Sequence, residues 1–273
     1  MAYSESEIKQ LKEKAKQVRR LIVEMLAKAG SGHPGGSLSA TDLITALYFK
    51  VLRFNAQDPS WPGRDRFHMS KGHCCPLWYA VLAESGYFPV EKLWTLRQLG
   101  SILQGHPDRR TPGVEVASGS LGQGLSVALG MGLAAKMDKL DYRVYCLLGD
   151  GEIQEGNIWE AAMACAHYKC DNICAMLDRN GFQIDGKTSQ VMSLEPVVAK
   201  WQAFGWHTIE IDGHNMEQIL CAYDEAKTVK NKPTIIVAHT VKGKGVSFME
   251  NVVDFHGRAP TKEETERALK ELE

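Results

Sequence analysis

Apolar residues occur along this chain in two alternating patterns, short continuous runs and longer stretches with helical spacing. The runs at residues 144–148 and 173–177 predict buried strands of a parallel sheet, because strands covered on both faces are apolar throughout. Between these runs, apolar residues recur at helical spacing: Ile158, Ala161, Ala162, Ala164 and Cys165. Such a strand–helix–strand unit brings both strand ends to the same edge of the sheet, where ligands of open α/β sheets bind.

The same alternation continues on both sides of this unit. Apolar spacing predicts helices at residues 5–29, 41–52, 76–84, 91–99, from 118–124 to 137, 194–204, 216–229 and 261–272, and strands at 206–211 and 234–239. Ser4 and Glu7 form a capping box for the first helix, which Gly30 ends. Segments 31–37, 55–66 and 242–257 are expected to be loops. The alternation predicts an α/β fold with a doubly wound, mostly parallel sheet and helices on both faces. No linker or repeat interrupts residues 1–273, so one domain is expected.

Composition narrows the class of protein. The 273 residues are 44% apolar and 24% charged with a net charge of −1, as in ordinary globular proteins, and nothing favours nucleic acid or an anionic membrane as a partner. No uncharged apolar run is long enough to cross a membrane, and the charged N-terminus does not resemble a signal peptide. Seven cysteines without a C-x-x-C pair are expected in a reducing cytoplasm, with Cys146, Cys165 and Cys174 buried.

Polar side chains end the two central strands. Gly149-Asp150-Gly151 follows the first strand, and Asp178-Arg179-Asn180 follows the second. Because the strands are predicted to be parallel, Asp150 and Asn180 should meet at one edge of the sheet. Their oxygen donors suit magnesium or calcium better than zinc.

A competing motif overlaps this region. Gly181, Gly186, Lys187 and Thr188 fit the phosphate-binding loop pattern G-x-x-x-x-G-K-[ST] of nucleotide hydrolases. That loop requires a helix that starts at the Lys-Thr pair, and residues 189–193 contain no apolar residues at helical spacing. Phe182 and Ile184 are also bulky where backbone amides should approach a phosphate. A tight turn at Asp185-Gly186 is the simpler interpretation.

Four histidines lie beside glycine in predicted loops: His33, His73, His106 and His256. One such histidine is more often an ordinary hydrogen-bonded loop residue, but four in the same setting put a functional role on a level with that interpretation. Sugar hydroxyls require groups that donate and accept protons near neutral pH, as imidazole does. The other histidines, His68, His167, His207, His214 and His239, are expected to be structural.

The segment Gly149-Asp150-Gly151, followed by Asn180, resembles the thiamine diphosphate motif. The residues around this motif are similar to those of transketolases. The histidine segments match the same family: Ser31-Gly32-His33-Pro34-Gly35, Lys71-Gly72-His73, Gly105-His106-Pro107 and His256-Gly257. The resemblance implies a thiamine diphosphate-binding fold of the diphosphate-binding (PP) type. It also implies that Asp150, Asn180 and the carbonyl of Phe182 hold Mg²⁺ (or Ca²⁺ or Mn²⁺) on the diphosphate. Arg179 departs from the pattern, since many members have Asn or Asp there.

The resemblance also implies roles for individual residues. His33, His106 and His256 would contact the donor sugar, while His73 and also His256 would contact the cofactor. Gly119, Ser120 and Leu121 match the loop beside the cofactor, although the family often has Pro at position 120, and Gly151 would offer its amide to the diphosphate. Glu155 would lie at a subunit contact near the pyrimidine ring and help to couple protons between sites. Glu152 and Glu155 both lie at a predicted helix start, where the helix dipole alone favours a carboxylate.

The resemblance covers only the first third to half of a full-length transketolase. The glutamate that activates the cofactor and the residues that grip the sugar phosphate belong to the following domains. The chain is therefore expected to be the N-terminal subunit of a split, cytoplasmic transketolase of the pentose phosphate pathway, in an α2β2 heterotetramer with a C-terminal partner carrying the pyrimidine-binding and C-terminal domains. It would move a two-carbon ketol unit from a ketose phosphate to an aldose phosphate. The alternatives are a split subunit of another thiamine diphosphate enzyme, such as a decarboxylase or deoxyxylulose-phosphate synthase, and a non-catalytic subunit that only stabilises or regulates a partner.

Overall fold

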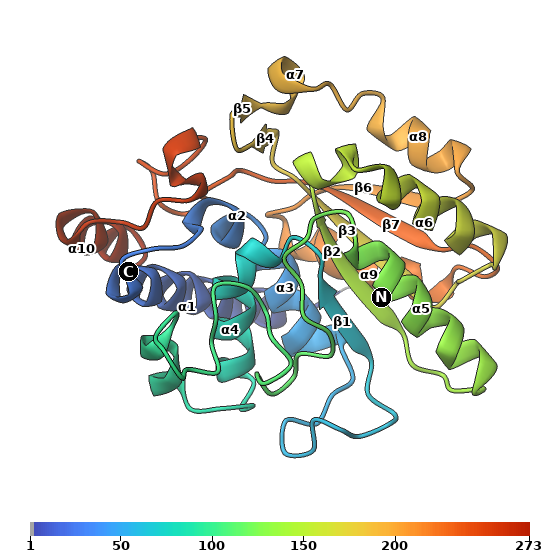
Figure 1. Cartoon of the computed structure of the whole chain (residues 1–273), viewed down its shortest axis with the longest axis horizontal. Coiled ribbons are helices and arrows are strands. Elements are labelled where there is room, and N and C mark those ends of the chain that lie inside the picture. The colour runs from blue at the N-terminus through green and yellow to red at the C-terminus, as the bar shows by residue number, and fades with distance from the viewer. Residues whose placement is uncertain (1–2) are drawn as a thin grey trace.

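A five-stranded parallel sheet lies at the centre of the molecule (Figure 1). In the computed structural model, which describes residues 3–273, the strand order is β1–β2–β3–β7–β6 and every neighbouring pair is parallel. The strands are β1 (Arg66–Met69), β2 (Val144–Gly149), β3 (Ile173–Arg179), β6 (His207–Asp212) and β7 (Thr234–His239). The predicted α/β fold and the predicted parallel pairing of β2 with β3 are confirmed.

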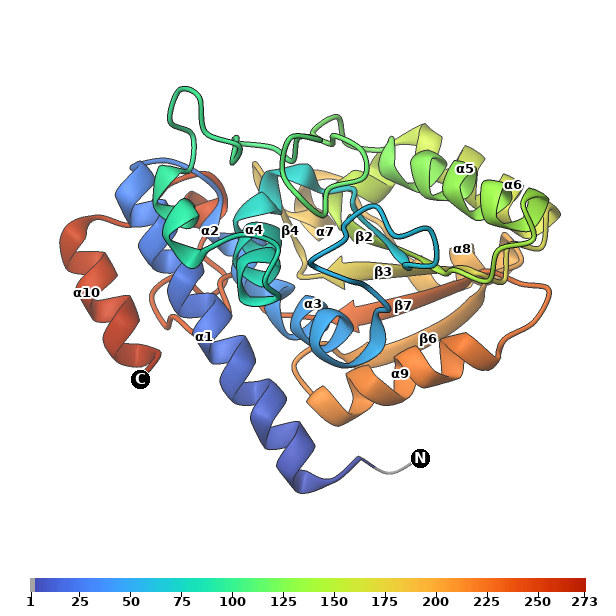
Figure 2. The same cartoon turned by 90° about the horizontal axis from the view of Figure 1, so that it is seen from below.

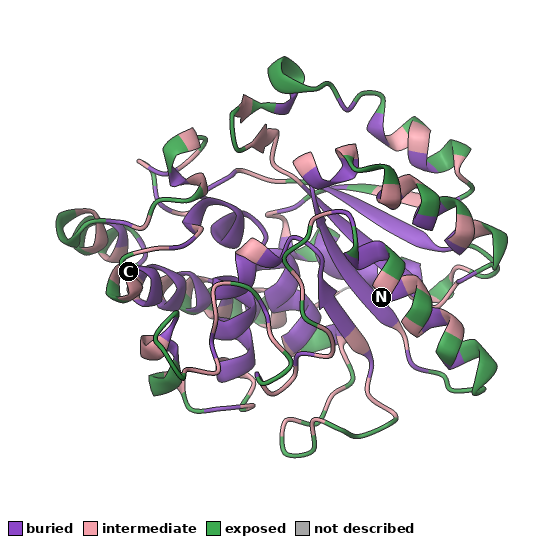
Figure 3. Ribbon diagram, in the orientation of Figure 1, coloured by how far each residue is buried: buried purple, intermediate pink, exposed green. Residues whose placement is uncertain are grey.

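Helices cover both faces of this sheet (Figure 2). One face packs against α5 (Gly124–Met137), α6 (Gly156–His167) and α8 (Val197–Ala203), and the other against α1 (Glu5–Ala29), α3 (Thr41–Ala46), α4 (Cys75–Glu84) and α9 (Met216–Thr228). Successive residues of β2 point to opposite faces. Tyr145 and Leu147 join one hydrophobic cluster, and Cys146 and Leu148 join the other. Both faces are therefore buried, as the continuous apolar runs predict (Figure 3).

The long first helix forms as its sequence predicts. Ser4 and Glu7 make the capping box at the start of α1, and Gly30 ends the helix in the left-handed region, at φ 65°. The remaining helical elements are short or peripheral: α2 (Pro34–Ser39), α7 (Thr188–Val191), α10 (Lys262–Glu271), the π-helical turn η1 (Leu47–Val51) and the 3₁₀ turns η2 (Gly72–Cys74), η3 (Val90–Thr95), η4 (Gly151–Gln154) and η5 (Val253–His256).

Two segments fold differently from their predictions. Residues 31–37 are not all loop, because α2 begins at Pro34, a residue that suits the first helical position. The glycines that argue against a helix allow close packing instead, since a Cβ on Gly36 would lie 2.6 Å from the Sγ atom of Cys74. The α-helix expected at 91–99 is only the 3₁₀ turn η3.

Strand β1 was not predicted. Its four residues contain no long apolar run, and the first of them, Arg66, still belongs to the polar segment 55–66. The strand forms because it pairs with β2, with Phe67 opposite Tyr145 and Met69 opposite Leu147. It matters for the site because its carboxyl end leads directly into Ser70 and η2.

Cys146, Cys165 and Cys174 are buried free thiols, as predicted. The boundaries of β6 and α9 differ from the predicted ones by a residue at one or both ends, and β7 matches its prediction. Within residues 3–273, no helix combines the length and the apolar character needed to cross a membrane.

Candidate active site

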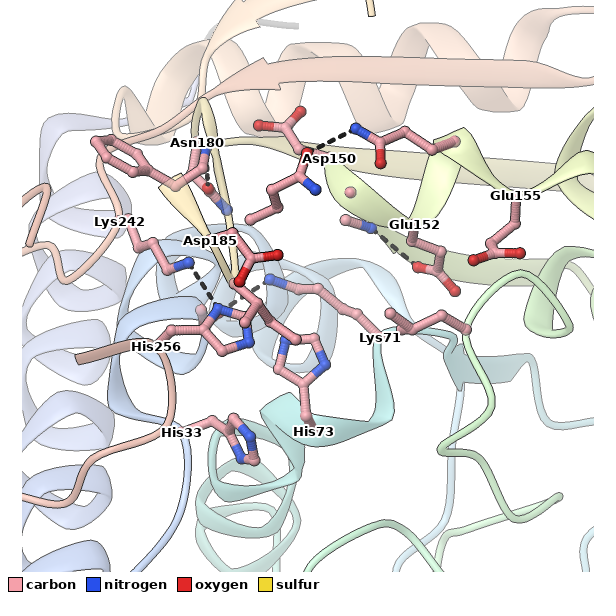
Figure 4. A pocket seen from close by; sticks show the side chains of 18 of the residues that line it. His33, Lys71, His73, Asp150, Glu152, Glu155, Asn180, Asp185, Lys242 and His256 are labelled. Carbon is pink, nitrogen blue, oxygen red and sulfur yellow. Dashed lines mark hydrogen bonds between the residues drawn. The ribbon is translucent and has the colours of Figure 1, made fainter. Parts of the chain in front are cut away.

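A cavity of about 400 Å³ opens at the carboxyl ends of β2 and β3 (Figure 4). All predicted site residues except Ser120 line it: His33, His73, His106, Gly119, Leu121, Asp150, Gly151, Glu155, Asn180, Phe182 and His256. Ser120 is exposed and borders a neighbouring depression beside His68. Segments that are far apart in sequence thus meet at the edge that the strand–helix–strand unit predicts.

Asp150 lies in the turn after β2 and is only 1% exposed. One carboxylate oxygen accepts a hydrogen bond from Arg179 Nη1 at 3.2 Å, and the other accepts one from the amide of Gly181. Burial raises the pKa of Asp150 to about 6, although Arg179 and the amide oppose the shift. Arg179, the departure from the family pattern, thus acts as a counter-ion for Asp150. A divalent cation would supply further positive charge to this carboxylate.

Asn180 is held in place by a buried hydrogen-bond network after β3. Its Oδ1 atom accepts from the amide of Phe182, and its Nδ2 atom donates to Asp178 Oδ2, both at 3.0 Å. Asp178 is fully buried and also accepts from Ser39, Thr240 and Lys71. In the described part of the chain, no group of three or more His, Cys, Asp or Glu side chains is arranged to hold a metal. A cation here would therefore depend on carboxylate, amide and carbonyl oxygens together.

Two lysines that sequence reasoning missed also line the cavity. Lys71 and Lys242 are each 2% exposed. Lys71 is paired with Asp178 and donates to the carbonyl of Gly36 at 3.0 Å. Across residues 3–273, no carboxylate lies within salt-bridge distance of Lys242, whose Nζ atom is 2.8 Å from His256 Nδ1. Burial lowers the pKa of Lys242 to about 8, so an anion in the cavity would stabilise its charged form.

Three imidazoles form a cluster on one side of the cavity. The ring centroids of His33 and His73 are 5.1 Å apart, those of His33 and His256 5.6 Å, and those of His73 and His256 5.3 Å. Burial and the nearby cations lower the pKa of His33 to about 4 and that of His256 to about 3, and they lower the pKa of His73 well below its usual value. These imidazoles are therefore neutral at neutral pH and can each donate and accept one hydrogen bond. The buried Nδ1 atom of His33 has no partner within residues 3–273, so a bound hydroxyl could complete it.

His106 lies apart from this cluster at the mouth of the cavity, where it is exposed. Its ring packs over Gly119, because a Cβ on that glycine would lie 3.2 Å from His106 Cγ. Gly119 also has a φ of +153°, which residues with a side chain rarely adopt. The histidine and the loop at 119–121 are therefore positioned by the same contact.

Two glutamates near the start of α6 differ in their surroundings. Glu152 is 1% exposed and accepts hydrogen bonds from Ser70 Oγ and from the amides of Gly122 and Gly149, the last two at 3.2 and 3.0 Å. It therefore ties the ends of β1 and β2 to Gly122, the residue after the loop at 119–121. Its place at a helix start predicts only a favourable interaction with the helix dipole. Glu155 is exposed at the N-cap of α6 and lines the outer edge of the cavity.

The overlapping nucleotide-loop pattern folds as a β-hairpin. Strands β4 (Phe182–Gln183) and β5 (Gly186–Lys187) pair antiparallel. The expectation that no helix starts at the Lys-Thr pair is wrong, since the single-turn helix α7 begins at Thr188. Three amides of this loop already have partners within the protein, however. The amide of Gly181 bonds Asp150, that of Phe182 bonds Asn180, and that of Thr188 bonds the carbonyl of Gly181.

The sequence matches a family model described as "Transketolase, thiamine diphosphate binding domain" over residues 10–272. It is 47% identical to a 6-deoxy-6-sulfo-D-fructose transketolase subunit from Clostridium sp. (strain MSTE9) over 264 residues, which cover 96% of each chain. It is also 46% identical to an apulose-4-phosphate transketolase subunit from Phocaeicola vulgatus, over 97% of this chain and 95% of that one.

Full-length transketolases match over part of their length. Human transketolase is 40% identical over 269 residues, and this chain spans 43% of it. The crystal structure of transketolase from Campylobacter jejuni superposes with a TM-score of 0.91 at 35% identity, covering 96% of this chain and 42% of that one. Fold, sequence and site geometry therefore agree, and the chain belongs to the transketolase family as a thiamine diphosphate-binding domain.

Proposed function

We propose that this chain is the N-terminal subunit of a two-polypeptide transketolase. The enzyme would use thiamine diphosphate and a divalent cation to move a two-carbon ketol unit from a ketose phosphate to an aldose phosphate. The observation that carries this proposal is a cavity with two different walls. The charged wall contains Lys71, Asp150, Asn180 and Lys242, and the imidazole wall contains His33, His73 and His256, which are neutral. Two relatives that match over almost their whole length are named as transketolase subunits, which supports the split arrangement. Residues 1–273 would act as one diphosphate-binding domain, since both hydrophobic clusters pack on the same sheet.

The charged wall fits the diphosphate end of the cofactor. Asp150, the Oδ1 atom of Asn180 and the carbonyl of Phe182 would hold the cation, which we propose to be Mg²⁺ because all three are hard oxygen donors. Lys242 would neutralise the diphosphate, because it is a buried cation without a carboxylate partner among the described residues. The amide of Gly151, at the start of η4, would donate to a diphosphate oxygen.

The imidazole wall fits a polyol. His33, His256 and, at the mouth, His106 would hydrogen-bond the hydroxyls of the donor sugar, and His73 would contact the cofactor. Because these imidazoles stay neutral, His33 and His106 can each donate to one oxygen and accept from another, whereas His256, whose Nδ1 atom lies 2.8 Å from Lys242 Nζ, has only Nε2 left for a ligand. Thiamine diphosphate supplies the nucleophilic carbon and the electron sink of ketol transfer when it is bound. The contribution of this chain is to hold the diphosphate, orient the sugar and shield the reacting atoms from water.

A partner chain would complete the site. We propose that it carries the pyrimidine-binding and C-terminal domains and joins two copies of this chain in a heterotetramer. Glu155 supports this arrangement, since it is exposed and yet lines the cavity edge, where a partner could bury it. The sugars that are used would then be selected largely by the partner. The two similar subunits are named for apulose 4-phosphate and 6-deoxy-6-sulfo-D-fructose, so ketoses with a terminal phosphate and with a terminal sulfonate both belong in a substrate panel.

The test is reconstitution. This chain and a candidate C-terminal partner are purified separately, mixed with thiamine diphosphate and Mg²⁺, and assayed for ketol transfer over the substrate panel. Activity is expected only when both chains, the cofactor and the cation are present. Full activity of this chain alone would contradict the split arrangement. A stable complex that never binds the cofactor would instead indicate a scaffold subunit.

A further inference from the structure

We infer that His214, held in a buried network with Arg19 and Asp42, positions Lys242 through its hydrogen bond to the backbone amide of Val241. The inference rests on the proposed function of Lys242 in holding the cofactor's diphosphate. The network lies outside the cavity and touches none of the proposed sugar-binding histidines in the contacts of residues 3–273. Its members are positioning residues, because they would act on the ligand only through Lys242.

The network joins three separate elements of the fold. Arg19 of α1 makes a bidentate ion pair with Asp42 of α3, with distances of 3.0 Å from Nη1 to Oδ1 and 2.6 Å from Nη2 to Oδ2. His214, in the turn between β6 and α9, brings its Nδ1 atom within 2.8 Å of Asp42 Oδ2. Arg19 and Asp42 are each 7% exposed, so the ion pair is largely shielded from water and its geometry is well defined.

Hydrogen-bond chemistry determines the tautomer of His214. Its Nε2 atom accepts from the amide of Val241 at 2.8 Å, and a nitrogen that accepts cannot also carry a proton. The proton of the neutral imidazole is therefore on Nδ1, where it is donated to Asp42. Asp42 in turn is kept ionised, because Arg19 and His214 hold its pKa at about 2 against the opposing effect of burial.

This arrangement reaches Lys242 through the segment after β7. Val241 directly precedes Lys242, and the carbonyl of Lys244 accepts from Arg19 Nε at 3.1 Å. The network therefore hydrogen-bonds the backbone on both sides of Lys242, at Val241 and at Lys244. The Lys242 stem lies against α2, where a Cβ on Gly35 would approach its Cγ and Cε atoms to 3.1 Å. A small shift of this segment would consequently move the Nζ atom within the cavity.

The turn that carries His214 is itself packed against this segment. A Cβ on Gly213 would lie 2.5 Å from Thr240 Cγ2, and the amide of Gly213 donates to the carbonyl of His239 at 2.8 Å. A buried ion pair is weak support for stability, because apolar residues of similar volume often stabilise a fold equally well. The network's geometry accounts better for a defined backbone position beside the lysine.

Two substitutions of His214 separate its two hydrogen bonds. In His214→Asn, the side-chain amide can replace Nδ1 and still donate to Asp42, but nothing accepts from Val241. In His214→Gln, the side-chain oxygen can replace Nε2 and accept from Val241, but the bond to Asp42 is lost. The complex of this chain with its partner is titrated with thiamine diphosphate and Mg²⁺, and exchange of the Val241 amide is measured in the full chain.

The inference predicts that His214→Asn weakens cofactor binding about tenfold and speeds exchange of the Val241 amide at least about tenfold, as expected for loss of one buried hydrogen bond. His214→Gln should stay within about threefold of wild type in both measurements. In a Lys242→Met background, His214→Asn should change binding by less than about twofold, because the two residues act as one unit.

Equal losses in the two His214 variants, or additive losses with Lys242→Met, would overturn the inference. If His214→Asn does not fold, the measurements on His214→Gln decide. A protected Val241 amide together with near-normal cofactor binding supports the inference, and a tenfold loss of cofactor affinity contradicts it. A wild-type complex that binds no cofactor contradicts the proposed function, while amide exchange still tests the network. Normal binding by both variants contradicts only the inference.

Discussion

The two walls of the cavity are built on different principles. The charged wall, made of Lys71, Asp150, Asn180 and Lys242, contains buried charged and polar groups with specific partners, among them Asp178 behind the wall. The imidazole wall, made of His33, His73 and His256, contains groups that burial keeps neutral. The first is suited to an ionic ligand that brings its own charge, and the second to hydroxyls. One cavity can thus bind the two chemically different ends of a cofactor–sugar pair.

Asp150→Asn should have the largest effect. It removes the carboxylate at the proposed cation position while keeping the size of the side chain. We expect metal-dependent cofactor binding and ketol transfer by the assembled complex to fall at least about 100-fold. Mutation of residues that only hydrogen-bond a metal's ligands already lowers metal affinity or activity about 10–100-fold. Asp138→Asn is the matched control, because Asp138 is exposed at the far end of α5. Activity within a few-fold of wild type in Asp150→Asn would contradict the proposal that the charged wall binds the cation and the diphosphate.

His33→Asn tests the imidazole wall. Loss of a hydrogen bond to a donor hydroxyl should lower kcat/KM for the ketose about 10–100-fold, which corresponds to about 1–3 kcal/mol. The dissociation constant of thiamine diphosphate should change by less than about threefold. The control is His167→Asn, an exposed position at the C-terminal end of α6. If cofactor binding and kcat/KM fell together, the division of labour between the walls would be wrong.

The neutral state of the imidazoles makes stability depend on pH. The folded pKa values of about 4 for His33 and about 3 for His256 lie below the ordinary value of 6.5. As pH falls from 6.5 to 4, the unfolded chain therefore binds protons that the folded chain does not, and stability falls. The slope should be at most about 1.4 kcal/mol per pH unit for each histidine. Urea unfolding at several pH values measures it, and a His33→Asn/His256→Asn variant should show a shallower slope. An identical slope in that variant would mean that the cluster does not stay neutral.

Lys187→Ala should have the smallest effect. Lys187 is exposed on β5, and the amides of Gly181, Phe182 and Thr188 are already bonded within the protein. Ketol transfer should stay within about twofold of wild type, as is usual for surface substitutions. Measurable ATP or GTP binding that disappears in this variant would revive the nucleotide-loop interpretation.

Local pattern was enough to predict the centre of the fold. Two continuous apolar runs predicted β2 and β3, and their parallel pairing brought Asp150 and Asn180 to one edge. What could not be predicted depends on neighbours in space. Strand β1 is too short to show a pattern of its own and forms by pairing with β2. Helix α2 depends on close packing that its glycines permit.

The missed site residues have the same explanation. Lys242 reaches the cavity because β7 lies beside β3. This strand order cannot be predicted from the local spacing of apolar residues. Glu152 reads as an ordinary helix-start carboxylate, and its role appears only when Ser70, Gly122 and Gly149 converge on it. Long-range contacts, rather than residue types, identify both residues.

The most direct test of the central claim is a calorimetric titration of thiamine diphosphate into the assembled complex, with and without Mg²⁺. The account predicts one cofactor bound per copy of this chain, with binding lost when a chelator removes the cation. Equal affinity without the cation, or equal binding by the partner alone, would contradict the claim that this cavity holds the diphosphate.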